Sequence, residues 1–235
     1  MSDFKIITDS SADLTEDMRI EFGAEKMIPF YMHILSETFI DDHTLNISLL
    51  LQKMRECTEK MASSCSDPEV WKTAFEKAKR AFAVTLSSKL SGSYASACAG
   101  LDMAKEDNPD CEGYVFDSQS AVSGETLLTI KLREFINEGL SMQEIIDKAE
   151  SFISKMKTFF VLDDVSNLVK NGRMSNIKGV IVQILGIRLI LGEKDGGIEL
   201  FDKAKAQFNF GKMRIVEMKG LSSFYACDRG VCMSF

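Results

Sequence analysis

The sequence predicts an α/β fold, in which an N-terminal domain with a parallel sheet and helices on both faces is followed by a smaller α+β domain. Three observations support this prediction. Short apolar runs alternate with helical segments along residues 5–162, which is the order that parallel strands with crossover helices require. The apolar runs end in Asp or Ser, as strands that lead into helix N-termini do. After about residue 165 the alternation stops.

The individual elements follow from apolar periodicity and from capping residues. The predicted strands cover residues 5–8, 27–34, 81–86, 114–116 and 159–162. The predicted helices cover residues 15–22, 46–60, 68–79, 94–105, 121–137 and 142–157. Pro68 suits the first position of its helix because a helix needs no N–H donor there, and Asp67 suits the cap before it.

The domain boundary is placed after residue 158. Residues 1–158 form the α/β domain with serine-rich loops at the strand ends, and residues 159–235 form the α+β domain. The second part is predicted to contain a turn at residues 172–175, an apolar segment at 179–191, a hairpin turn at 192–197 and a strand at 198–201. No linker rich in Pro, Gly or Ser separates the two parts, so we expect them to pack closely.

Four of the predicted strands end in polar residues. These ends are Thr8-Asp9-Ser10, Leu86-Ser87-Ser88, Asp117-Ser118 and Asp163-Asp164. In a parallel sheet they would share one edge, where open α/β sheets bind their ligands. Helix capping explains each single site equally well. The recurrence favours a shared polar cleft.

Charge and hydropathy exclude several partners. The 28 basic and 35 acidic residues give a net charge of −7, which argues against binding to nucleic acid or to an anionic membrane. The longest apolar stretch, residues 179–191, contains Gln183 and Arg188 and is shorter than the roughly 20 residues of a membrane span. Residues 1–5 contain no basic leader segment. We therefore expect no stable membrane insertion and a cytoplasmic location.

Common catalytic and cofactor motifs are missing from the sequence. A Ser-His-Asp triad or a multi-histidine metal centre would need His33 or His43, and neither lies in such a motif. We expect both to be ordinary strand or loop residues. The six cysteines form no C-x-x-C pair, and no P-loop, G-x-G-x-x-G or G-x-S-x-G motif occurs. The sequence therefore predicts no catalytic residue, no metal site and no cofactor.

Hydroxyl-rich loops precede two of the predicted helices. Ser63 and Ser64 come before the helix at residue 68, and Ser91 and Gly92 come before the helix at residue 94. Free N–H groups at a helix N-terminus attract an anion, hydroxyls add donors, and glycine allows close approach to the backbone. Helix capping alone is the alternative for either loop.

Small residues recur along the helix that follows Ser91. They are Ala95, Ala97, Ala99 and Gly100. Small side chains on one helix leave room beside it. Close packing of a second helix is the usual cause, and space for a slender apolar ligand is the alternative.

Taken together, these segments resemble the DegV family of bacterial fatty acid-binding proteins. Residues 8–14, TDSSADL, are similar to the family's opening T-D-S-[ST]-A-D-L. Residues 63–69, SSCSDPE, resemble its T-S-Q-P-S-P-E loop, and residues 90–97, LSGSYASA, resemble L-S-G-T-Y-Q-S-A. The resemblance extends over about residues 4–206.

The resemblance implies a function and a set of site residues. One long-chain fatty acid would lie between two domains, with its carboxylate held by Ser63 and Ser91 in loops that also contain Ser64 and Gly92. Arg173 would lie near the open end. Family members serve as the acyl-binding subunit of a fatty acid kinase, so the expected partner is a separate catalytic subunit that makes acyl phosphate. The chain itself would be a lipid carrier and not an enzyme.

The sequence departs from the family pattern at several positions. Ser63 replaces a threonine, and Cys65 and Ser66 replace glutamine and proline. Residues 208–235 show no resemblance, and the family's final strands and helices are not expected there. A truncated C-terminal domain would leave one wall of the ligand tunnel open, so we expect weak acyl retention and self-association.

Two other functions stay open at this point. One is an enzyme domain similar to dihydroxyacetone kinase, whose chemistry uses a covalent substrate histidine. The other is a partner-binding module with an incomplete pocket.

Overall fold

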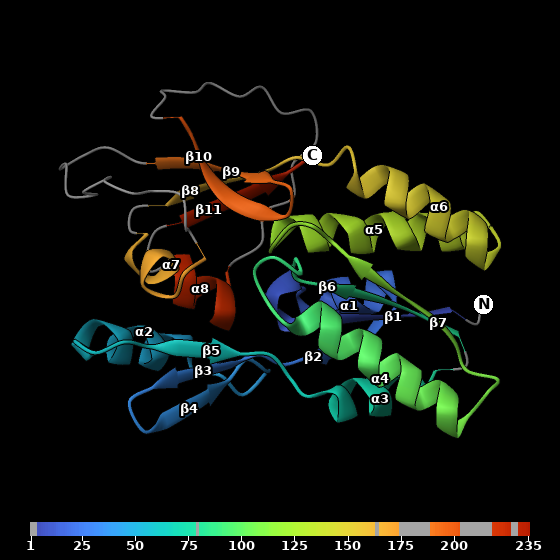
Figure 1. Ribbon diagram of the computed structural model, residues 1–235, viewed down its shortest axis with the longest axis horizontal. Coiled ribbons are helices and arrows are strands. Elements are labelled where there is room, and N and C mark those ends of the chain that lie inside the picture. Colours follow the sequence, from blue (N-terminus) through green and yellow to red (C-terminus); the bar gives the residue numbers. More distant parts are fainter. Residues whose placement is uncertain (1–3, 79, 163–164, 174–188, 203–217, 227–229) are drawn as a thin grey trace.

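The computed structural model describes residues 4–78, 80–162, 165–173, 189–202, 218–226 and 230–235 (Figure 1). Within this part of the chain, a parallel sheet has the strand order β2-β1-β6-β7. Its strands are Ala24–Ile28, Phe4–Asp9, Arg80–Thr85 and Glu112–Asp117 in that order. Every neighbouring pair is parallel. The predicted parallel sheet is therefore confirmed.

Helices cover both faces of the parallel sheet, as predicted. One face packs against α1 (Glu16–Phe22), α5 (Ser123–Asn137) and α6 (Met142–Ile153). The other packs against α3 (Pro68–Glu76) and α4 (Ser93–Asp107). Alternation along β1 and β6 explains the two layers, since Ile6 and Phe82 face the first and Ile7 and Ala83 face the second. Figure 1 shows α5 and α6 on the opposite side of the sheet from α3 and α4.

Gly100 allows α4 to approach α3 closely. A Cβ atom at this position would lie 2.6 Å from the backbone oxygen of Pro68 and 2.6 Å from the Cβ of Trp71. Trp71 is fully buried under this contact. Of the two explanations for the small residues of α4, close helix packing is the one that the structure supports at Gly100.

A second sheet is antiparallel and has the strand order β10-β9-β8-β11. The strands are Gly197–Asp202, Leu189–Lys194, Thr158–Leu162 and Gly230–Ser234. The strand predicted at 159–162 thus belongs to this sheet, and its end does not share the edge of the parallel sheet. Asp163 and Asp164 lie outside the described residues. This part of the prediction was wrong because sequence periodicity does not encode strand direction.

The β9–β10 turn is tighter than the predicted turn at residues 192–197. Strand β9 continues to Lys194, and the turn consists of Asp195 and Gly196 with φ angles of +52° and +79°. Positive φ at both central residues is the geometry that a two-residue hairpin requires. The Gly196 carbonyl accepts a 2.5 Å hydrogen bond from Ser87, which docks the turn against the end of β6.

A small antiparallel sheet with the order β4-β3-β5 lies beside α2 (Ile47–Glu56). Its strands are Glu37–Ile40, Tyr31–Ile34 and Ala62–Ser64. The single strand predicted at 27–34 is divided between β2 and β3 at Pro29 and Phe30. The backbone of Phe30 does not take part in strand pairing. Its N–H donates to Ser10 Oγ at 3.0 Å, and its carbonyl accepts from the N–H of Asp41 at 2.9 Å.

The C-terminal part contains elements that the sequence did not predict. Besides α7 (Ser166–Lys170), these are α8 (Gly220–Ala226) and β11, which contradict the expected lack of final strands and helices. The Asp41 carboxyl group caps α8 by accepting from the N–H groups of Gly220 at 3.1 Å and Leu221 at 3.0 Å. Strand β11 pairs with β8, with Cys232 opposite Phe160. Both elements depend on partners far away in the sequence.

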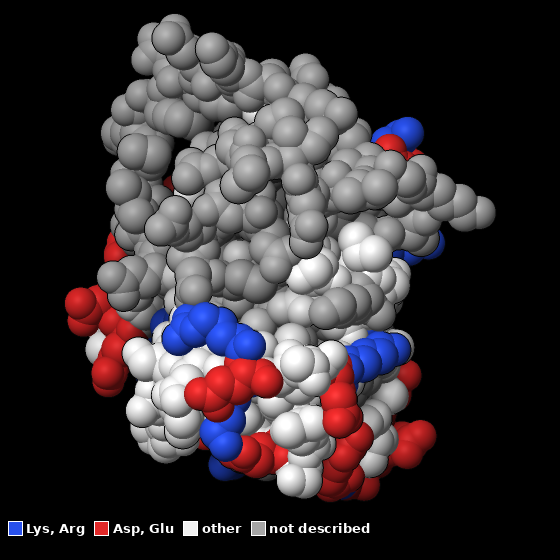
Figure 2. Space-filling view, turned by 90° about the vertical axis from the view of Figure 1, so that its left-hand side faces the viewer, with Lys and Arg blue, Asp and Glu red and all other residues white. Residues whose placement is uncertain are grey.

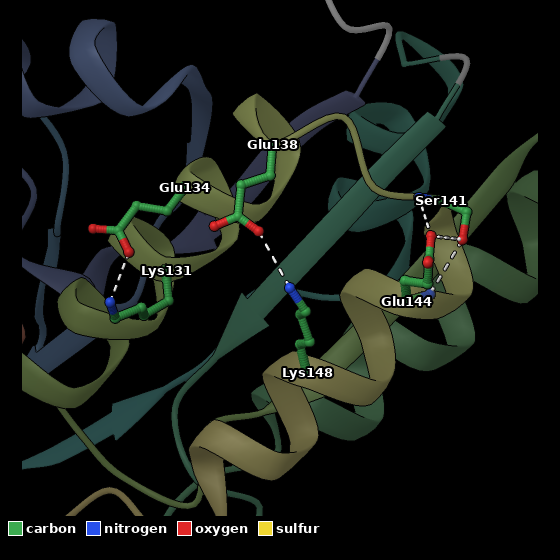
Figure 3. A network of polar contacts seen from close by, with 6 residues as sticks. All are labelled: Lys131, Glu134, Glu138, Ser141, Glu144 and Lys148. Carbon is green, nitrogen blue, oxygen red and sulfur yellow. Dashed lines mark hydrogen bonds and ion pairs between the residues drawn. The ribbon is translucent and has the colours of Figure 1, made fainter.

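Charged side chains on the surface stabilise local structure. Lys148 Nζ of α6 lies 3.2 Å from Glu138 Oε2 at the end of α5. Ser141 and Glu144 cap the start of α6 reciprocally, and Figure 3 shows both contacts. In the lower part of Figure 2, acidic and basic residues are intermixed. Such exposed pairs contribute at most about 1 kcal/mol each. Among the described residues, no helix combines the length and the apolar composition that crossing a membrane needs.

Candidate functional site

A cavity of about 300 Å³ lies where the carboxyl ends of β1 and β6 meet the C-terminal elements. Its apolar walls come from the end of β6, the start of α5, the C-terminal sheet, α7 and α8; they include Leu86, Leu90, Ala121, Val122, Phe160, Leu162, Leu168, Ile198, Leu221 and Ala226. Polar atoms come from a few serines, Arg173 and Tyr225. A concave, mainly apolar space with few polar groups is typical of a site for a small amphipathic molecule.

All the binding residues proposed from the sequence line this cavity. They are Ser63, Ser64, Ser91, Gly92 and Arg173. The first two lie on β5, the next two in the loop before α4, and the last one after α7. Chain segments far apart in the sequence therefore converge on one space.

The Ser91 hydroxyl accepts one backbone hydrogen bond and also contacts the Cys65 thiol. Its Oγ accepts a 3.1 Å hydrogen bond from the N–H of Ser93, so the O–H proton is left for another acceptor. The Ser93 hydroxyl in turn donates to Asp9 Oδ2 at 2.6 Å. Asp9 thus fixes the loop that presents Ser91 and Gly92.

Ser63 and Ser64 have different partners. Ser63 Oγ lies 2.8 Å from the hydroxyl of Tyr225 on α8. Ser64 Oγ lies 2.9 Å from His33 Nε2, while His33 Nδ1 lies 3.1 Å from Thr38 Oγ1. His33 is a strand residue in β3, as predicted, and its ring nitrogens are occupied by these two hydroxyls. Neither it nor His43 is among the described residues that line the cavity.

Arg173 lines the cavity and is held by backbone carbonyls. Its Nη1 donates to the carbonyl of Asn171 at 2.5 Å, and its Nε donates to the carbonyl of Leu90 at 3.4 Å. The guanidinium carbon lies 5.9 Å from the centre of the Tyr225 ring. Of the predicted 172–175 turn, only Gly172 and Arg173 are described, and Gly172 has a positive φ of +72°.

A buried acid network reaches the cavity through Ser11, which is one of its lining residues. Ser11 Oγ is 2.6 Å from both Asp9 Oδ1 and Glu125 Oε1. Burial, reinforced by Asp9, raises the pKa of Glu125 well above its usual value. A hydroxyl has a single proton, so a protonated Glu125 supplies the second hydrogen in this chain.

Glu125 also supports a strained part of the wall. Its Oε1 accepts from the N–H of Val122 at 3.1 Å, and Val122 has a φ of +52°. Positive φ is unfavourable for a β-branched residue and persists where surrounding contacts enforce it. The sequence indicated Asp9 and Ser11 as a polar strand end but gave no sign that they pair with Glu125.

Sequence reasoning also missed the contribution of the last residues to the cavity. Leu221, Ser222, Tyr225, Ala226 and Cys232 all line it. No motif marked them, because they lie in the segment without resemblance. The wall that we expected to be open is in part formed by α8 and β11.

The thiols in the cavity are poorly suited to nucleophilic chemistry. Burial raises the pKa of Cys232 to about 12 and also raises the pKa of Cys65. Thiols are weak nucleophiles when protonated. Across the described ranges, no three His, Cys, Asp or Glu side chains are grouped closely enough to hold a metal ion.

Comparison with known sequences gives a consistent relationship. A family model described as an uncharacterised protein of the DegV family matches residues 3–218. DegV domain-containing proteins of Streptococcus pneumoniae serotype 4 and Streptococcus gordonii are 36% and 37% identical over 207 and 206 residues. Each alignment covers 86% of this chain and 73% of the relative.

Solved structures agree with the sequence comparison. A DegV family protein from Ruminococcus gnavus with vaccenic acid has a TM-score of 0.92 at 27% identity, with 100% of both chains covered. The Streptococcus pneumoniae fatty acid kinase (Fak) B3 protein loaded with linoleic acid has a TM-score of 0.88 at 30% identity, with 100% of this chain and 99% of that chain covered. This chain belongs to the DegV family.

Proposed function

We propose that this protein binds one long-chain fatty acid in the cavity and presents its carboxylate to a separate kinase subunit for acyl phosphate formation. The observation that supports this most is the convergence of Ser63 and Ser91 on a space with mainly apolar walls. Two similar structures contain vaccenic acid and linoleic acid, which are ligands of the same class.

The two parts of the ligand would be held by different forces. Burial of each methylene group contributes about 0.8 kcal/mol, so the apolar walls would hold the tail. The carboxylate would accept hydrogen bonds from Ser63 and Ser91, with Ser64 and Gly92 beside it. The ligand would lie between the parts before and after residue 158, since both contribute to the cavity wall.

The protein would act as a carrier and leave catalysis to its partner. The cavity's protonated thiols and the engaged ring of His33 offer no evident nucleophile or base. The partner would be the ATP-using catalytic subunit of a fatty acid kinase, and a supply of ATP implies a cytoplasmic location.

Removing the serine hydroxyls tests the carboxylate site. Ser63→Ala and Ser91→Ala should each weaken fatty acid binding by roughly 1–3 kcal/mol, because each leaves part of a buried carboxylate without a donor. Native mass spectrometry of the purified protein, followed by titration of the delipidated protein with vaccenic acid, measures the loss. Ser88→Ala removes an exposed hydroxyl that does not line the cavity and should change nothing. Full retention of fatty acid by the double variant would refute the assignment.

Arg173→Ala tests the presentation step. If Arg173 contacts the kinase subunit or the phosphorylated head group, acyl binding should stay nearly intact while acyl phosphate formation falls. Arg173→Lys should rescue only in part, since lysine lacks the planar fork that grips two oxygens. Acyl affinity, melting temperature and kinase-dependent turnover are measured on the same samples. Parallel loss of all three would show instead that Arg173 serves only to hold the Leu90 and Asn171 backbone.

A further inference from the structure

Tyr225 reaches the candidate head-group site from outside the part of the chain that defines the family. The family model ends at residue 218, whereas Tyr225 lies on α8 and lines the cavity beside Ser63. We propose that the Tyr225 hydroxyl is a third hydrogen-bond donor to the fatty acid carboxylate and sets the preference for an acid over a neutral head group. This inference rests on the proposed function and assigns a further residue to its site.

The number of hydroxyl protons on Ser63 and Tyr225 supports a direct contact with the ligand. The Ser63 and Tyr225 oxygens are 2.8 Å apart, so without ligand one hydroxyl donates to the other and one proton stays unused. An ionised carboxylate is a stronger acceptor than a serine hydroxyl and accepts through both of its oxygens. When a carboxylate lies beside the pair, both protons therefore turn toward it, and Ser91 adds a further one.

The position of Tyr225 is fixed by the contacts that hold α8 and the tyrosine ring. Asp41 caps the first turn of α8, and Asn167 Nδ2 donates to the carbonyl of Phe224 at 3.0 Å. The Phe224 ring packs edge-on against Tyr225, with 5.1 Å between ring centres. The guanidinium carbon of Arg173 lies 5.9 Å from the centre of the Tyr225 ring. A donor held this way costs little ordering entropy on binding.

The test compares Tyr225→Phe with Tyr114→Phe in the full-length protein. Tyr114 is a matched control because its hydroxyl donates to Glu150 at 3.0 Å and it does not line the cavity. Each delipidated variant is titrated with cis-vaccenic acid and with cis-vaccenyl alcohol. The Tyr225→Phe variant loses a hydrogen bond to a charged group, so its affinity for the acid should fall about tenfold or more. Its preference for the acid over the alcohol should fall by about fivefold. Tyr114→Phe should leave both affinities unchanged.

The other outcomes overturn distinct parts of the proposal. Equal losses for acid and alcohol would make Tyr225 a wall residue without a role at the carboxylate. An unchanged Tyr225→Phe in a parent that binds the acid would refute the inference and leave the proposed function standing. A parent that binds neither lipid would refute both. The shared contact would be supported further if the ligand-free variants keep their melting temperature. The double variant Ser63→Ala/Tyr225→Phe should then lose less free energy of acid binding than the two single variants lose together.

Discussion

Asp9→Ala is expected to lower the free energy of unfolding by about 3–5 kcal/mol. The Asp9 carboxyl group is only 1% exposed and links three chain segments. Its Oδ1 accepts from the N–H of Ser11 at 3.2 Å and from Ser11 Oγ at 2.6 Å. Its Oδ2 accepts from the N–H of Leu86 at 2.9 Å and from Ser93 Oγ at 2.6 Å. Truncation leaves these buried donors without an acceptor.

The same substitution should weaken fatty acid binding beyond its effect on stability. Without Asp9, the Ser93 hydroxyl loses its acceptor, and the loop in which the N–H of Ser93 donates to Ser91 Oγ is no longer fixed. Urea unfolding and titration with vaccenic acid at a temperature where the variant is folded separate the two effects. Asp102→Ala, on the exposed side of α4, is the matched control and should cost little. A change in unfolding free energy below about 1 kcal/mol would contradict the role given to Asp9.

The parallel sheet could be predicted because its signals are local. Buried strands such as β1 and β6 are short apolar runs, each followed by a polar end and a capped helix. The small sheet could not be predicted in the same way. Strands β4 and β5 span Glu37–Ile40 and Ala62–Ser64, which are too short and too exposed to show an apolar alternation.

The C-terminal elements were missed because their stabilising partners are distant. The cap of α8 is Asp41, which precedes it by 179 positions, and β11 is held by its pairing with β8. Residues 203–217 and 174–188, which include most of the predicted apolar segment, lie outside the described residues. A resemblance that ended near residue 206 therefore gave no information about the wall that α8 provides.

The candidate site was predictable where chemistry and loop position coincide. Ser63 and Ser91 lie in hydroxyl-rich segments before helices, so residue type and position together suggested an anion site, although Ser63 belongs to strand β5 and not to a loop. Tyr225 offered no such signal, since a tyrosine in an apolar segment is ordinary core material. The Glu125–Ser11–Asp9 chain depends on α5 lying against β1, which is a tertiary contact.

Asp13→Asn is expected to remove one contribution to the pH dependence of stability between pH 4 and 8, while Glu125 and Asp41, whose pKa values burial also raises, keep theirs. Asp13 is 3% exposed, and its Oδ1 accepts from the N–H of Lys219 at 3.2 Å. Burial, with a further contribution from Asp41, raises its pKa from 3.8 to about 7, while Ser222 and Lys219 oppose the rise. Asparagine suits the site sterically, since Asp13 has a φ of +51° and asparagine tolerates this conformation.

The sign of the effect follows from proton linkage. Between pH 3.8 and about 7, the folded protein holds a proton on Asp13 that the unfolded chain has lost. Raising the pH through this window therefore lowers the free energy of unfolding of the native protein, and the contribution of Asp13 to this decrease is at most about 4 kcal/mol. Asparagine stays neutral throughout, so the variant should match the native protein near pH 4 and exceed its stability at pH 8.

Urea unfolding at pH 4, 6 and 8 measures this difference directly. Asp102→Asn changes an exposed carboxyl group on α4 and should follow the native protein at every pH. The charge on Asp13 opposes folding at the junction with Lys219, where α8 begins and from which Tyr225 reaches the cavity. A stability difference between Asp13→Asn and the native protein that is the same at all three pH values would show that Asp13 is not protonated in the folded state.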